Sequence, residues 1–253
     1  MKEVIKNSYK VYKDDLSEVI LEFDSLGRNF GNQDRNALKL FDLPFGVINV
    51  KSFKIPNLVN KIAYRFFRKS KAQRSYEYAN ILKSKGIGTP EPIAYYEFQS
   101  LFFFGKSFYV SQQIDCDYTY RELTTDFSIP NYETILRQFT RFTFQLHEQE
   151  INFLDHSPGN TLIKRTTAGY EFFLVDLNRM KFGPLTFEER IKNFAKLTIH
   201  KSMIEVMSDE YAKCIQRDYN EVFDLMWAST LEFQERFHRR KRIKKKLKFW
   251  KNH

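Results

Sequence analysis

The sequence predicts an α+β protein of two lobes, in which an antiparallel sheet with one long helix precedes a mostly helical half. Strand-like segments rich in β-branched and aromatic residues fill most of positions 9–114. One long helical pattern interrupts them after Pro56, and helical patterns dominate after a connector with few apolar residues in register, 115–130. We therefore expect an N-terminal lobe at 1–114, a C-terminal lobe at 115–235 and a basic tail at 236–253.

Length and composition indicate a globular protein. The 253 residues are 42% hydrophobic and include 26 Phe and 14 Tyr, which is enough to fill a core. Cys116 and Cys214 match no C-x-x-C pattern, so the sequence predicts neither a disulfide framework nor a zinc site. We expect a cytoplasmic protein, because the N-terminus lacks the apolar run of a signal peptide and no segment approaches a membrane span.

The formal net charge of +10 is concentrated at one end. Segment 236–251 contains ten of the 41 Lys and Arg residues and no acid, which leaves 31 basic and 31 acidic side chains elsewhere. Its basic residues alternate with aromatic and aliphatic ones, a pattern that suits an anionic membrane surface. RNA or DNA is the rival partner, since basic and aromatic residues also bind phosphates and bases. A solvated helix end is the third alternative.

In the first lobe we expect strands at 9–12, 17–23, 37–41 and 47–53, and further strands within 93–114 with a hairpin turn at Gly105-Lys106. The helix should run from Pro56 to Gly86 with a break near Ser70. In the second lobe, apolar residues at i, i+3 and i+4 predict an amphipathic helix at 131–149. Thr186 and Glu189 form a capping-box pattern, and a long last helix should begin near Asn220 and enter the basic tail.

Three side chains after the amphipathic helix suggest a site for phosphoryl transfer. Asp155 and Asn160 lie five residues apart on a predicted turn, and Asp176 ends the apolar run 172–175. Asp155 is the candidate base that orients an acceptor hydroxyl, while Asn160 and Asp176 offer the hard oxygen ligands that Mg²⁺ prefers. A D-x-x-x-x-N pair alone is weak support. The whole series, from amphipathic helix through hairpin to Asp176-Leu-Asn, matches the order of a bilobal protein-kinase-like fold.

Two upstream residues extend this prediction. Lys51 lies in a strand and Glu77 in the following helix, where a kinase has its phosphate-binding lysine and the acid that holds it. Lys54 is a rival, but it faces the other side of a regular strand, whereas Lys51 shares the face of Phe53. The alternative is that Lys51 and Glu77 are a solvated strand Lys and a solvated helix Glu.

Gly27 and Gly31 are the candidates for the turn that covers nucleotide phosphates. They stand in Leu26-Gly-Arg-Asn-Phe-Gly31, which departs from G-x-G-x-x-G. Their backbone N–H groups would bind phosphate, and an ordinary hairpin is an equal alternative.

Three segments together resemble the lipopolysaccharide kinase (Kdo/WaaP) family. They are KSKAQRSYEYANILKSKGIGTPEPIAYYE at 69–97, FLDHSPGNTLI at 153–163 and LVDLNRMKFG at 174–183, and the similarity covers roughly 47–183. The resemblance implies a kinase-like enzyme that uses ATP and Mg²⁺ to phosphorylate a sugar hydroxyl of a lipopolysaccharide-core glycolipid. It implies the roles given above for Lys51, Glu77, Asp155, Asn160 and Asp176, and attachment at the inner face of the inner membrane.

The sequence departs from the kinase pattern in three places. Phe153 and Leu154 stand where His or Arg usually precedes the catalytic acid, Asn178 replaces the Gly of the metal-binding triplet, and no A-P-E follows Asp176. An atypical protein kinase with a short activation segment and a nucleotide-binding pseudokinase scaffold are therefore the alternatives. We expect His147 and His156 to be structural.

Overall fold

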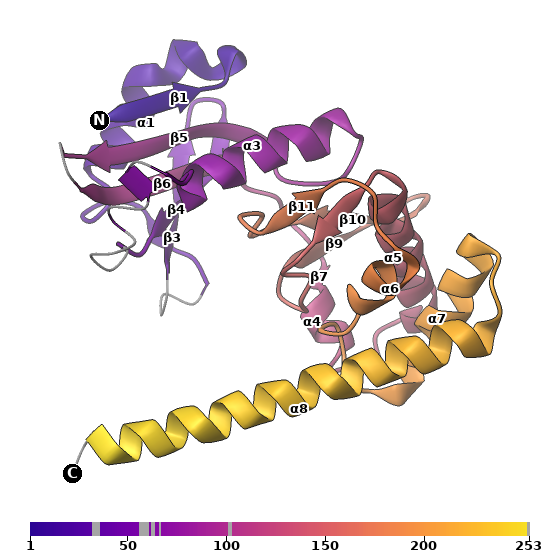
Figure 1. The fold of residues 1–253 in the computed structure, drawn as a ribbon. Coiled ribbons are helices and arrows are strands. Elements are labelled where there is room, and N and C mark those ends of the chain that lie inside the picture. Colours follow the sequence, from indigo (N-terminus) through magenta and orange to yellow (C-terminus); the bar gives the residue numbers. More distant parts are fainter. Residues whose placement is uncertain (32–35, 56–60, 62–63, 66, 101–102, 252–253) are drawn as a thin grey trace. The chain divides into compact units, whose positions relative to one another are not determined.

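The computed structural model describes residues 1–31, 36–55, 61, 64–65, 67–100 and 103–251, the last six by their backbone alone. The chain forms two compact units (Figure 1). The first consists of Met1–Asp115 and Phe173–Arg179, and the second of Cys116–Phe172 and Met180–His253. No helix within the described ranges is long and apolar enough to cross a membrane.

The first unit is built on a six-stranded antiparallel sheet of order β1-β5-β6-β4-β3-β2. The strands expected at 37–41 and 47–53 are confirmed as β3 and β4, and the later ones as β5 and β6. The N-terminal β1 was not expected. The strands are β1 (Lys2–Ile5), β2 (Arg28–Asn29), β3 (Asn36–Leu43), β4 (Gly46–Phe53), β5 (Pro92–Gln99) and β6 (Phe104–Gln112).

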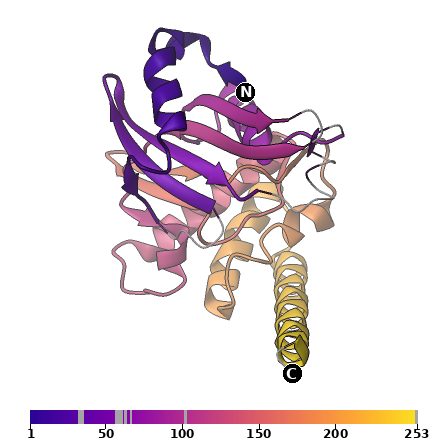
Figure 2. The same cartoon turned by 90° about the vertical axis from the view of Figure 1, so that its left-hand side faces the viewer.

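The strands expected at 9–12 and 17–23 are wrong. The chain forms a 3-10 helix, η1 (Asn7–Tyr12), and then α1 (Lys13–Leu21) (Figure 2). Leu16, Val19, Ile20 and Phe23 are all buried in one core cluster with the sheet, at the i, i+3, i+4 and i+7 spacing of a helix face. The β-branched residues of this segment had suggested strands, but its apolar residues repeat at the period of a helix.

The hairpin turn expected at Gly105-Lys106 is also wrong, since both residues lie within β6. The connection spans residues 100–103, between the end of β5 and the start of β6. A Cβ at Gly105 would lie 2.9 Å from the carbonyl oxygen of Phe98, beside a register shift between Glu97 and Gln99. This glycine marks a close approach of two backbones.

Helix α3 (Lys71–Ser84) packs against β5 and β6. The break expected near Ser70 is confirmed, because the Ser70 hydroxyl caps α3 by accepting from the Gln73 N–H at 3.0 Å. The part of the expected helix at 56–60, 62–63 and 66 lies outside the described residues. Tyr76 of α3 contacts the ring of Tyr95, which pairs with Tyr109, so α3 covers the sheet face opposite α1.

The second unit contains two small sheets and most of the helices (Figure 1). One sheet has the order β10-β9-β7 and the other pairs β11 with β8. The predicted amphipathic helix is confirmed as α5, whose buried face includes Ile135, Leu136, Phe139, Phe142 and Leu146. The elements are β7 (Tyr118–Thr119), α4 (Tyr120–Leu123), α5 (Tyr132–Glu148), β8 (Ile151–Phe153), β9 (Thr161–Thr166), β10 (Gly169–Leu174), β11 (Met180–Phe182), α6 (Phe187–Lys192), α7 (Lys201–Ile215) and α8 (Tyr219–Lys251).

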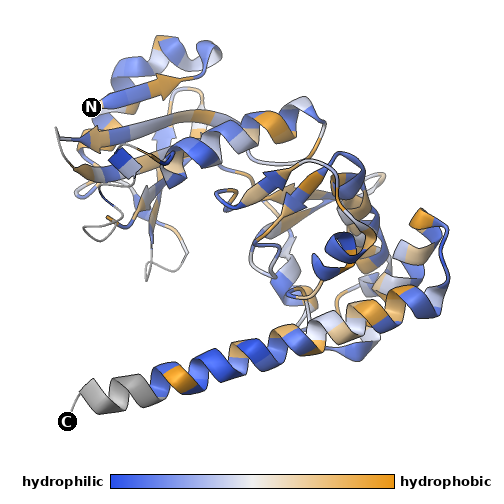
Figure 3. Ribbon diagram, in the orientation of Figure 1, coloured by the Kyte–Doolittle hydropathy of each residue, from blue (hydrophilic) through white to orange (hydrophobic). Residues whose placement is uncertain are grey.

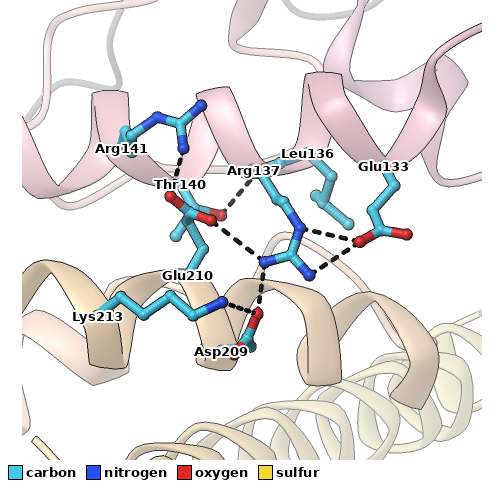
Figure 4. A network of polar contacts seen from close by, with 8 residues as sticks. All are labelled: Glu133, Leu136, Arg137, Thr140, Arg141, Asp209, Glu210 and Lys213. Atoms are coloured by element: carbon cyan, nitrogen blue, oxygen red, sulfur yellow. Dashed lines mark hydrogen bonds and ion pairs between the residues drawn. The ribbon is translucent and has the colours of Figure 1, made fainter.

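Charged side chains join α5 to α7 (Figure 4). The Arg137 guanidinium lies 2.5 Å from an Asp209 oxygen, 3.2 Å from Glu210 and 2.8 Å from Glu133. Arg141 also pairs with Glu210, whose side chain is only 10% exposed. The hydrogen bonds raise the pKa of Arg137, chiefly the one to Asp209. The network satisfies the carboxylates where the two helices pack.

Helix α8 begins against α6 and α7, where Val222, Met226 and Thr230 are buried. Its later turns run beyond the other elements of the second unit, and every residue from 235 to 245 is exposed. Figure 3 shows these turns as largely hydrophilic, with Ile243 among the exposed apolar residues. Three turns of helix therefore have all their faces in solvent.

Candidate active site

Lys51 and Asp176 meet within the first unit. β4 places Lys51 opposite Tyr109, on the sheet face covered by α3, and the Lys51 amine lies 2.7 Å from Asp176 Oδ1. The amine also lies 5.4 Å from the centre of the Phe53 ring on the same face. Only 14% of the Lys51 side chain is exposed. A sheet lysine and a carboxylate far along the chain thus form one charged pair.

Backbone contacts fix Asp176. The Leu174 N–H donates to the Gly88 carbonyl at 2.9 Å, and the Thr89 hydroxyl donates to the Leu174 carbonyl at 2.8 Å. Asp176 itself has a φ of 57°, in the left-handed region that Asp tolerates better than most residues. Strain of this kind concentrates at functional sites.

Asn178, which replaces the expected Gly of the triplet, orients the Asp176 carboxylate. Its buried amide donates to Asp176 Oδ1 at 2.6 Å. Asp176 Oδ1 thus accepts from an amide and pairs with an ammonium group. The departure from Gly therefore supports a fixed carboxylate orientation.

Lys71 is a further cation under the electrostatic influence of this pair, and the sequence did not lead us to expect it. Burial lowers the pKa of Lys71, at the start of α3, against the opposing effect of Asp176. Arg179, Arg74 and Lys51 lower it further, which places all of them in the same electrostatic neighbourhood. In the sequence, the basic run K-S-K-A-Q-R at 69–74 was the signal for Lys71 and Arg74. The charges of Lys51, Arg74 and Arg179 are thus close enough to Lys71 to affect its titration, and a local excess of positive charge favours an anionic ligand.

Glu77 does not form the expected ion pair with Lys51. Within the described residues, its carboxylate accepts from Lys69 at 2.8 Å and from the Gln73 amide at 2.9 Å. The hydrogen bond to Glu77 raises the pKa of Lys69. The physical reason is that Asp176 supplies the counter-charge of Lys51, while Glu77 has nearer partners on its own helix and just before it.

Gly27 lies in a tightly packed turn against Phe41. Its φ is +84°, and a Cβ there would lie 2.6 Å from the Phe41 ring. Gly31 has a φ of +64°, and a Cβ there would meet nothing within 4 Å. Both residues flank the edge strand β2, which pairs with β3. Phosphate binding by this turn stays a prediction.

Asp155 and Asn160 lie on a loop of the second unit built from two successive turns. The His156 N–H donates to the Phe153 carbonyl at 3.0 Å, and the Asn160 N–H donates to the Ser157 carbonyl at 2.9 Å. Pro158 and Gly159 occupy the centre of the second turn, as turn chemistry favours. The Asn160 amide nitrogen donates to the Asp155 carbonyl at 2.8 Å, so its Oδ1 atom is the end suited to a cation.

A buried network lies behind this loop. The Asn193 amide nitrogen donates to the Phe153 carbonyl at 2.9 Å and to Asn152 Oδ1 at 3.0 Å. Asn193 Oδ1 lies 3.3 Å from His147 Nε2 and 3.2 Å from His156 Nδ1. Because an amide oxygen only accepts, both rings must donate to it. His147 Nδ1 then accepts from the Tyr211 hydroxyl at 2.7 Å.

Both histidines are neutral scaffold residues. Burial lowers the pKa of His147 to about 3 and that of His156 to about 4, against an ordinary value of 6.5. The hydrogen bonds to Asn193 oppose these shifts without reversing them. Their burial agrees with the structural role expected from the sequence.

The arrangement offers hard oxygens and cations but no complete metal cage. Among the described residues, no group of three or more His, Cys, Asp or Glu side chains gathers as a metal site. Mg²⁺ needs few protein ligands when phosphates supply the others. Asp176 in the first unit and Asn160 in the second each carry a hard oxygen of the kind that Mg²⁺ binds, and their role as metal ligands stays a prediction.

Comparison with known proteins identifies the fold. No protein-family model matches the chain, and no curated protein matches it. Among solved structures, one described as WaaP in complex with acyl carrier protein matches with a TM-score of 0.64. It is 15% identical, and the match covers 95% of this chain and 99% of that one. The chain thus has a kinase-like fold similar to that of WaaP, with an antiparallel N-terminal sheet and a helical C-terminal part.

Proposed function

We propose that the protein is an ATP-dependent phosphotransferase that phosphorylates a sugar hydroxyl of a lipopolysaccharide-core-type glycolipid. The observation that supports it most is the ion pair between Lys51 and Asp176, with Asp176 held at a positive φ. The kinase-like fold supports the reaction class. The acceptor follows from the sequence resemblance at 69–97, 153–163 and 174–183.

In this proposal each residue has one task. Lys51, with Lys71 and Arg179 nearby, binds the nucleotide phosphates, and Asp176 and Asn160 provide the ligands for Mg²⁺. The metal neutralises charge on the transferring phosphoryl group. Asp155 accepts the proton of the acceptor hydroxyl and orients its oxygen toward the γ-phosphorus.

The basic end of α8 would hold the enzyme at an anionic membrane surface, where a lipid-linked acceptor is available. Exposure of residues 235–245 leaves the Arg and Lys side chains of these turns accessible. Each such residue near anionic headgroups contributes about 1 kcal/mol of attraction.

The test incubates the protein with γ-labelled ATP, Mg²⁺ and a membrane-lipid extract. Asp155→Asn should lower transfer to the lipid fraction on the order of 10²- to 10⁴-fold, because the general base is lost. Asp176→Asn should abolish the Mg²⁺-dependent thermal shift with ATP. Asp224→Asn, an exposed carboxylate of α8, is the control and should match the wild type.

The alternatives give different results in the same assay. Label on protein with none on lipid would indicate a protein kinase. A thermal shift with ATP and Mg²⁺ but no transfer or hydrolysis would indicate a pseudokinase, the alternative suggested by Phe153 and Leu154 ahead of Asp155. Unchanged transfer in Asp155→Asn and Asp176→Asn would refute the site itself.

A further inference from the structure

The loop that presents Asp155 has no polar side chain immediately before the carboxylate. Phe153 is buried and Leu154 is 41% exposed, and neither side chain has a group to bind a carboxylate or a carbonyl. Besides the hydrogen bonds within the loop, these residues receive further contacts from elsewhere in the second unit. The structure shows them arriving from the segment that follows α6, residues 193–197.

This segment is a rigid support. Three short-range backbone hydrogen bonds hold it, from Phe194 N to Ile191 O at 3.1 Å, from Ala195 N to Lys192 O at 3.2 Å and from Leu197 N to Phe194 O at 2.9 Å. The side chains of Phe194 and Leu197 are fully buried. A side chain between two such anchors loses little freedom when it binds its partner.

Lys196 lies between those anchors and binds the loop twice. Its amine donates to the Leu154 carbonyl and lies 3.7 Å from Asp155 Oδ1. The side chains of Lys196 and Asp155 are each about a third exposed, at 32% and 33%. Asn193 donates to the carbonyl of Phe153 at 2.9 Å. Two successive carbonyls before Asp155 thus bind two residues of one buried segment.

We propose that Lys196 is the positioning residue of Asp155, fixing the Leu154 backbone and orienting the carboxylate toward the acceptor hydroxyl. This inference rests on the proposed function. In that reaction the acceptor oxygen forms its bond to the γ-phosphorus as the bond from that phosphorus to the ADP oxygen breaks. Asp155 takes the acceptor proton, and Lys196 gains and loses nothing. Lys196 thus supplies the support that His or Arg before the acid gives elsewhere.

The test measures kcat and KM for ATP, using Mg²⁺-ATP hydrolysis and transfer to a membrane-lipid extract. Lys196→Met should lower kcat on the order of 10- to 100-fold, because a small displacement of a reacting group is costly. KM for ATP should stay within about twofold, since Lys51 and Asp176 are unchanged. Lys196→Arg should recover most of kcat because it keeps a cationic donor.

Two controls separate positioning from folding. Lys192→Met changes an exposed lysine at the end of α6 and should leave kcat unchanged. In an Asp155→Asn background, Lys196→Met should add little further loss, because residues that act as a unit are non-additive. If Lys196→Met does not fold, Lys196→Gln, which is uncharged but keeps a hydrogen-bond donor, replaces it in both backgrounds.

The possible outcomes distinguish a failure of the proposed function from a failure of the positioning role of Lys196. A wild-type protein that neither hydrolyses ATP nor transfers phosphate would overturn the proposed function and this inference together. An active wild type with unchanged kcat in Lys196→Met would overturn the inference alone. So would a loss of equal size in the wild-type and Asp155→Asn backgrounds, since that pattern indicates a general structural role.

Discussion

The Asn193 amide connects five groups of the second unit. It joins His147 and His156 to the backbone of Phe153 and to Asn152, and His147 extends the chain to Tyr211. Burial disfavours the charged form of both rings, and it outweighs the hydrogen bonds to Asn193, which favour that form. The two rings therefore make the support of the Asp155 loop sensitive to acid.

We expect the free energy of unfolding to fall as pH decreases from 6.5 to 5. The pKa values of His147 and His156 are lowered to about 3 and about 4 in the folded protein, so in this range only the unfolded chain binds these protons. Each histidine then costs about 1.4 kcal/mol per pH unit. Urea titrations at several pH values measure the slope.

His156→Gln is the matched variant for this prediction, because glutamine does not titrate. Its slope between pH 6.5 and 5 should be close to half that of the wild type. Equal slopes in the two proteins would show that His156 is not one of the groups responsible.

At the scale of single elements, the spacing of apolar residues predicted the long helix α5, whereas in the short segment of α1 we gave more weight to residue type than to spacing. The apolar spacing of α5 predicted both the helix and its buried face. In α1 the same spacing was present, but Val19 and Ile20 suggested a strand because β-branched residues favour sheets. The helix wins because its apolar face covers the sheet, and two acids in its first turn suit the helix dipole.

The candidate site contains residues suggested by their order in the sequence and residues that only the fold brings together. Asp155, Asn160 and Asp176 were assigned because their order along the chain is the motif, and their roles stay predictions. Lys196 and Asn193 could not be assigned, because only tertiary folding brings the segment after α6 to the loop. The partner of Lys51 was predicted wrongly, since a lysine can choose among several acids and sequence spacing does not rank them.

Replacement of Arg137 should weaken the packing of α5 against α7 and lower the free energy of unfolding. Arg137→Met leaves Glu210, which is nearly buried, and Asp209 without their shared partner. We expect a loss of about 1–3 kcal/mol in unfolding free energy, because the nearly buried Glu210 keeps Arg141 but loses the second cation that offsets its desolvation.

Lys213→Met is the control for this network, because Lys213 is 65% exposed and pairs with Asp209 one turn away on α7. Such surface pairs contribute about 0.5 kcal/mol or less. Urea denaturation midpoints compare the two variants at equal m-value. Similar losses in both would mean that burial of Glu210 is not what makes the network important.

At the scale of the whole molecule, the basic end of α8 should decide where the protein resides. Removal of the residues after Glu235 should lower sedimentation with anionic vesicles severalfold, because the cationic turns are lost. Vesicles of neutral lipid should sediment neither protein, and raised salt should weaken binding of the full chain.

Two results would change this view of α8. Equal sedimentation of the full and shortened chains with anionic vesicles would refute surface attachment through these turns. Retention of the full chain on RNA or DNA, with no binding to vesicles, would favour a nucleic-acid partner. The shortened chain should keep ATP hydrolysis, since the residues proposed to act on the nucleotide all precede Glu235.

The first unit is assembled from two separate pieces of chain, and this has a consequence for biosynthesis. Segment Phe173–Arg179 supplies Asp176 to Lys51 and binds Gly88 and Thr89 through Leu174. A ribosome makes about 5–20 residues per second and in one direction. The sheet lysine therefore emerges well before its acidic partner, and the Lys51–Asp176 pair can form only after residues 116–172 of the second unit have been made.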